Sequence, residues 1–129
     1  WSIWSMKRIL ILLPTLLLVL SCGPNCKDFK KGRFKLEGPY AGDIIVERTD
    51  AIQTESSVEG NYKNEFFIQW IDDCSYSLVL KSSDNPSSIS LGPQDTLNVQ
   101  IIETQSNKCL TVAKLDDLRF EVSQVKMND

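Results

Sequence analysis

The chain of 129 residues contains no histidine. Histidine is the usual general base near neutral pH, so its absence excludes Ser-His-Asp and Cys-His nucleophile systems and nearly all catalytic zinc sites. The sequence also lacks glycine-rich phosphate-binding loops and the G-x-S-x-G nucleophile motif. We therefore predict that the protein is not an enzyme and that it has no catalytic residues, no cofactor and no metal site.

An excess of positive charge is also missing. The chain has 14 basic and 17 acidic residues, a net charge of −3. A nucleic-acid-binding domain normally presents a strongly basic surface, so we expect no nucleic-acid partner. The length allows one domain.

Only one long hydrophobic run occurs, from Ile9 to Leu20, directly after Lys7 and Arg8. A basic start and about a dozen apolar residues are typical of a secretory signal helix, and the run is too short to span a bilayer comfortably. Its end, Val19-Leu20-Ser21-Cys22, resembles the lipobox of bacterial lipoprotein signals, which implies cleavage before Cys22 and attachment of lipid to its thiol.

The resemblance to a lipobox divides the chain into four parts. We expect upstream non-native residues at 1–5, a lipoprotein signal peptide at 6–21, a tether at 22–32 and a single β domain at 33–129. The protein would then be held by its lipid on a membrane of the bacterial envelope, the outer membrane in preference to the inner. The tether and the start of the domain are basic, which suits either contact with anionic head groups or simple solvation.

Beyond the tether the sequence alternates between apolar and polar residues with a period of two, which is the pattern of β-strands with one face in a core. Turn residues such as Gly, Pro, Asn and Asp separate the runs. We predict an all-β fold of about eight antiparallel strands in a meander, forming a small barrel or a rolled sheet. The predicted strands are 33–37, 43–49, 51–56, 64–72, 74–83, 96–106, 108–115 and 118–126.

The alternation also predicts which side chains form the core. The expected core residues are Phe34, Phe66, Trp70, Tyr76, Leu78, Leu97, Val99, Leu110, Val112, Phe120 and Val122.

If Cys22 carries lipid, three thiols remain in an oxidising compartment. Cys26 precedes the first strand and Cys74 lies at a turn between two strong strands, so a bond between them would attach the N-terminal segment to the sheet. Cys109 falls inside a predicted strand and is expected to be free and buried. The spacing of the three shows no metal-binding pattern.

Acidic pairs and one polar cluster are the remaining candidates for chemistry. Asp72-Asp73 and Asp116-Asp117 are interpreted as turns, because Asp bonds to its own backbone there. Arg48 could meet Gln53 or Glu55 across a turn between paired strands. This cluster would either line a pocket or pair on a solvated face, and the solvated face is the favoured interpretation. With a pocket, the lining would be Arg48, Gln53, Glu55, Phe66, Trp70 and Tyr76.

As a whole the chain resembles a group of small bacterial envelope lipoproteins without an established activity. The resemblance rests on Asn25-Cys26-Lys27-Asp28-Phe29-Lys30 and on Trp70-Ile71-Asp72-Asp73-Cys74-Ser75-Tyr76-Ser77-Leu78. The two cysteines in these blocks are those expected to pair. A weaker similarity, of architecture only, is to lipocalin-type barrels through Gly32-Arg33-Phe34, although the tryptophan that follows this glycine in lipocalins is missing here.

These observations favour a lipid-anchored binding module for a small apolar ligand or an envelope protein. The alternative is a structural or interaction lipoprotein with a filled core and no ligand. An interior cavity would favour the first over the second, since eight-stranded barrels can either fill with side chains or hold one small ligand.

Overall fold

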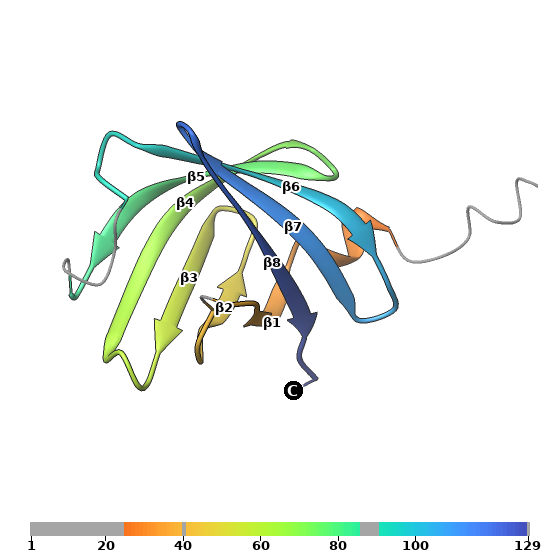
Figure 1. Ribbon diagram of the computed structural model, residues 1–129, viewed down its shortest axis with the longest axis horizontal. Coiled ribbons are helices and arrows are strands. Elements are labelled where there is room, and N and C mark those ends of the chain that lie inside the picture. The colour runs from red at the N-terminus through yellow and green to blue at the C-terminus, as the bar shows by residue number, and fades with distance from the viewer. Residues whose placement is uncertain (1–24, 40, 86–90, 129) are drawn as a thin grey trace, which may run out of the picture.

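The structure is a computed structural model that describes residues 25–39, 41–85 and 91–128. The predicted signal helix and the lipidation site Cys22 lie outside the described residues. Eight antiparallel strands follow a short 3₁₀ helix, and Figure 1 shows how they wrap around a common interior. The elements are η2 (Cys26–Phe29), β1 (Gly32–Glu37), β2 (Ile45–Arg48), β3 (Ile52–Ser57), β4 (Tyr62–Asp72), β5 (Ser75–Ser83), β6 (Thr96–Thr104), β7 (Lys108–Leu115) and β8 (Leu118–Lys126).

The strands form a closed up-and-down barrel. Each strand pairs with its neighbour in the sequence, and β1 pairs with β8 through partners such as Lys35 and Val125. The predicted all-β meander of eight strands is therefore confirmed, and of the two expected forms it is the barrel. Its strands begin and end within three residues of the predicted bounds, because turn residues limit each run on both sides.

Both acidic pairs lie at hairpin turns, as predicted: Asp72 ends β4 and Asp73 follows it in the turn, and Asp116-Asp117 form the turn between β7 and β8. Asp72 accepts a hydrogen bond from the backbone N–H of Cys74 at 2.8 Å in the turn between β4 and β5. Asp116, between β7 and β8, has a φ of 52°, a left-handed conformation that Asp tolerates better than most residues. These carboxylates shape hairpins.

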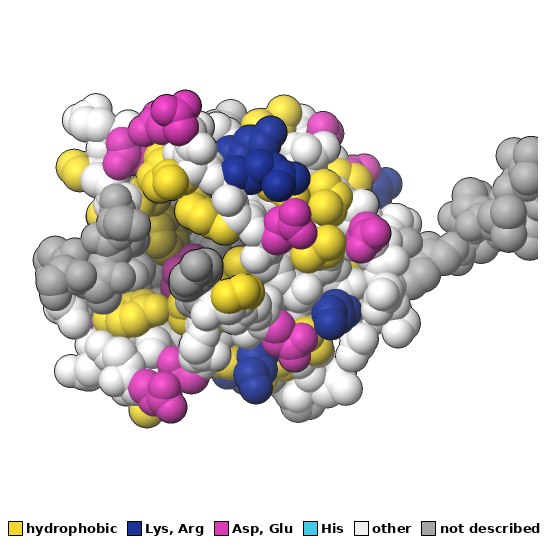
Figure 2. Space-filling view, viewed as in Figure 1, with side chains coloured by type: hydrophobic (Ala, Val, Ile, Leu, Met, Phe, Trp, Pro, Cys, Tyr) yellow, Lys and Arg dark blue, Asp and Glu magenta, His cyan; other side chains and the backbone are white. Residues whose placement is uncertain are grey.

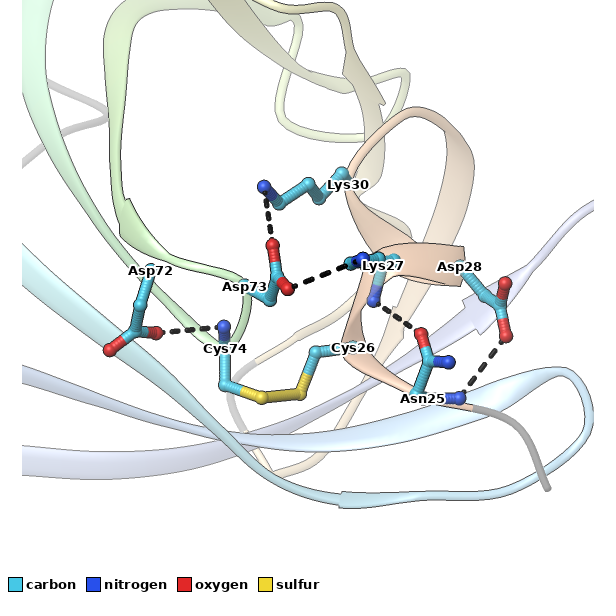
Figure 3. The surroundings of a disulfide bond; sticks show 8 residues. All are labelled: Asn25, Cys26, Lys27, Asp28, Lys30, Asp72, Asp73 and Cys74. Atoms are coloured by element: carbon cyan, nitrogen blue, oxygen red, sulfur yellow. Dashed lines mark hydrogen bonds and ion pairs between the residues drawn. A yellow bond between two sulfur atoms is a disulfide. The ribbon is translucent and has the colours of Figure 1, made fainter. Parts of the chain in front are cut away.

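One end of the barrel is closed by η2 and a disulfide. The bond joins Cys26 to Cys74, with their Cα atoms 5.1 Å apart, and so confirms the predicted pairing. Figure 3 shows the bond between the helix and the β4–β5 turn, beside an ion pair of 3.0 Å between Lys30 and Asp73. Phe29 at the end of η2 is completely buried. The folded part thus begins before residue 33, inside the segment expected to be a tether.

The hydrophobic core consists of two clusters. The cluster at the closed end contains Cys26, Phe29, Phe34, Val46, Ile101 and Cys109. The second contains Phe66, Ile68, Tyr76, Leu78, Leu91, Val99 and Ala113. Cys109 is free and only 1% exposed, as predicted.

The expected core is wrong at two positions. In β7 the inward residues are Cys109, Thr111 and Ala113, so Leu110 lies on the other face and is only partly buried. The pairs Val99–Ala113 and Ile101–Thr111 set this phase, because Val99 and Ile101 on β6 are themselves buried. Phe120 lies on the inward face of β8, as predicted, but its side chain remains 38% exposed.

Candidate functional site

The barrel contains a cavity of about 570 Å³ beyond the closed-end cluster, and this cavity is open to the surface. Figure 2 shows a hollow on the viewed face with hydrophobic side chains around it. All eight strands contribute to the lining, because the meander turns alternate residues of every strand toward the same interior. The lining residues are Leu36, Ala41, Ile44, Val46, Gln53, Glu55, Tyr62, Asn64, Phe66, Tyr76, Leu78, Leu91, Leu97, Val99, Thr111, Ala113, Leu115, Phe120, Glu121, Val122 and Gln124.

The cavity has two chemically different walls. Polar side chains gather on β3 and β4, where Gln53 and Glu55 lie opposite Phe66 and Asn64 in the strand register. The wall from β5 to β7 is mostly apolar and includes Leu78, Leu97, Val99, Ala113 and Leu115. The site therefore suits a molecule with one polar and one apolar side.

Arg48, only 3% exposed, lies beneath the cavity. Its Nη1 donates to Gln53 Oε1 at 2.9 Å and to Tyr76 Oη at 3.3 Å. Its Nη2 donates to the Phe29 carbonyl at 2.6 Å and to Gln124 Oε1 at 2.9 Å. Four strands and η2 are thereby connected through one guanidinium.

The acceptors in this network are all neutral oxygens, so the buried charge is solvated by dipoles. Aromatic rings supply further electrostatic stabilisation, since the Arg48 Cζ lies 4.5 Å from the ring centre of Phe34 and 5.1 Å from that of Tyr76. Burial raises the pKa of the Tyr76 phenol, which therefore stays protonated and can accept from Arg48.

Glu55 is the carboxylate of the polar wall. The Gln53 amide, which accepts from Arg48, points its Nε2 toward Glu55 Oε2 at 3.5 Å. Burial raises the pKa of Glu55 to about 7, against the smaller lowering effect of the Gln53 hydrogen bond. Its side chain borders the cavity and is partly exposed. Glu55 thus changes charge near neutral pH inside the barrel.

The six residues of the expected pocket are brought close together, but they do not all line it. Gln53, Glu55, Phe66 and Tyr76 are lining residues. Arg48 forms the network below them. The favoured interpretation of a solvated face is wrong for Arg48 and Gln53, which are each 3% exposed, because the phase of β2 and β3 turns them inward.

Trp70, the sixth residue, does not line the cavity. It packs against Tyr76 with ring centres 4.6 Å apart and lies between the two core clusters. Lys30 Nζ also lies over this ring, 5.0 Å from its centre. Trp70 therefore supports the position of Tyr76.

Several polar residues of the site were not predicted from the sequence. Asn64 and Gln124 are 2% and 5% exposed, and Thr111 is 2% exposed. A signal was available for two of them: Asn64 shares the period of Phe66, and Gln124 shares that of Val122. A polar residue in an apolar phase indicates an interior hydrogen bond, here from Gln124 Nε2 to Tyr76 Oη at 3.1 Å.

Within the described residues, no group of three His, Cys, Asp or Glu side chains is placed to hold a metal ion. No helix in the same part of the chain has the length and apolar character required to cross a membrane. Comparison with family models, curated proteins and solved structures finds no match to this chain.

Proposed function

We propose that this protein is a lipid-anchored envelope protein whose barrel binds a small, largely apolar ligand without chemical conversion. The cavity of about 570 Å³ carries the proposal, because this volume lies within the range of small-molecule sites. Its mixture of apolar side chains with a few polar groups is also typical of such sites.

The cavity volume also favours ligand binding over the alternative of a structural lipoprotein with a filled core. In a filled eight-stranded barrel, inward side chains occupy the interior to about the density of other protein cores. Here the positions beside the cavity include small residues, such as Ala113 and Thr111 on β7. Larger residues at these positions would reduce the space.

Filling the cavity tests the proposed function. Ala113→Phe is expected to reduce binding of the neutral apolar dye N-phenyl-1-naphthylamine at least tenfold, measured by its fluorescence. The matched control Lys114→Phe places the same ring on the exposed face of the same strand and should leave dye binding unchanged. Equal dye binding by both variants, with native circular dichroism, would contradict binding inside the barrel.

The proposed anchor is tested separately. Cys22→Ala removes the thiol that would carry the lipid, so the protein is expected to leave the membrane fraction or to keep its signal peptide. Fractionation and intact-mass measurement of protein from bacterial cells report both results. A Cys22→Ala protein that is cleaved at residue 21 and still sediments with membranes would disprove the anchor.

A further inference from the structure

We propose that the cavity selects amphipathic amines, with a ligand ammonium group against Glu55 and an apolar chain or ring against the wall from β5 to β7. This inference rests on the proposed ligand-binding function and names the chemical class of the ligand.

The first argument is the charge of the lining. The described lining residues include two acids, Glu55 and Glu121, and no lysine or arginine. Glu121 lies at the exposed edge, where its Oε2 pairs with Arg119 Nη1 at 3.5 Å. Glu55 is therefore the charged group available to a ligand inside the barrel.

The second argument is that the terminal nitrogens of the nearby cation are already occupied, while its Nε, which has no hydrogen-bond partner among the described residues, is buried. Arg48 does not line the cavity, and both its terminal nitrogens donate to protein oxygens. A carboxylate ligand would thus have to approach Glu55 without a free guanidinium to bind. Like charges in a medium of low dielectric repel, so the site disfavours anionic amphiphiles.

The third argument concerns the hydrogen bonds of Glu55. An ionised carboxylate can accept about four, and a buried one is costly unless it is paired. The hydrogen bond that Glu55 accepts from Gln53 is long, 3.5 Å. An ammonium group supplies three donors and a positive charge, whereas an alcohol supplies a single neutral donor. The wall opposite offers Leu78, Leu97 and Val99 to the apolar part.

Of the ionisable groups in this part of the site, Glu55 is the one whose charge changes near pH 7. Gln53 connects it to the permanent cation Arg48. Tyr62 and Tyr76 face it from β4 and β5, and both phenols have a raised pKa, so they stay neutral. Asp43, which acts on Tyr62, has a lowered pKa and stays ionised. With a pKa of about 7 for Glu55, its ionised fraction rises about tenfold from pH 6 to pH 8.

Titration calorimetry with decylamine, decanol and decanoate, which share one chain and differ in the head group, tests the inference. We expect wild-type protein at pH 8 to bind decylamine at least tenfold more tightly than decanol, and decanoate least. Decylamine affinity should fall about tenfold from pH 8 to pH 6 while decanol affinity stays constant, because only the ammonium requires ionised Glu55.

Two variants locate the effect. Glu55→Gln keeps the shape but removes the charge, so decylamine and decanol should then bind equally. Glu47→Gln removes the same charge from the outside of the adjacent strand β2, where the side chain is 60% exposed, and should preserve the preference for the amine.

Equal binding of the three probes by wild-type protein, tighter binding of decanoate, or an amine preference that survives in Glu55→Gln would overturn this inference. In each of these cases the neutral dye still binds, so the proposed function stands. Loss of binding for the dye and all three probes would instead reject ligand binding itself.

Discussion

Replacing both Cys26 and Cys74 with alanine is expected to lower the free energy of unfolding by about 4 kcal/mol. The disulfide closes a loop with a sequence separation of 48 residues, and the entropy of closing such a loop in the unfolded chain gives this magnitude. For a domain of this size the loss corresponds to a fall in melting temperature of roughly 20 °C. Thermal and urea unfolding followed by circular dichroism would measure it.

The controls for this prediction use the third cysteine and the redox state. Cys109→Ala removes a buried thiol without breaking a bond and should cost only about 1 kcal/mol. Reductant should destabilise the wild-type protein but leave the double variant unchanged. A double variant as stable as the wild type would show that η2 is held without the disulfide, by the packing of Phe29 and by polar contacts such as the Arg48 hydrogen bond to the Phe29 carbonyl.

The second prediction is that Arg48→Met destabilises the barrel by about 3 to 5 kcal/mol. Methionine keeps much of the side-chain volume but leaves Gln53, Gln124 and the Phe29 carbonyl as buried acceptors without their donor. Unsatisfied buried polar groups of this kind cost about 1 to 3 kcal/mol each, with partial relief from rearrangement.

Arg119→Met is the matched control, because Arg119 is an exposed arginine whose pair with Glu121 is a surface ion pair. Its replacement should change the free energy of unfolding by less than about 0.5 kcal/mol. If Arg48→Met were as stable as wild type, the desolvation cost of the buried guanidinium would match its hydrogen bonds, as occurs for some buried charged groups. The network would then orient Gln53 without stabilising the fold.

The outlines of the strands could be read from the sequence because they depend on local patterns. Alternation in β4 and β5, with Asp72-Asp73 between them, specifies a hairpin before any distant contact forms. The pairing of Arg48 with Gln53 is similarly local, since a short turn joins β2 to β3. The disulfide followed from the placement of two cysteines at element ends.

What the tertiary structure decided is the phase of ambiguous strands and the contents of the interior. In β7 the central residues of both phases, Leu110 and Val112 against Thr111 and Ala113, are small or apolar, and only Lys108 and Lys114 near its ends mark the outward face. The pairing with β6 and β8 turns Thr111 and Ala113 inward. Whether the barrel is filled depends on the summed volume of inward side chains from eight strands, which no single segment contains. The burial of Glu55, and with it the raised pKa, is a consequence of that closure. The sequence by itself thus determined the strands and their order, while barrel closure determined the cavity and its charge.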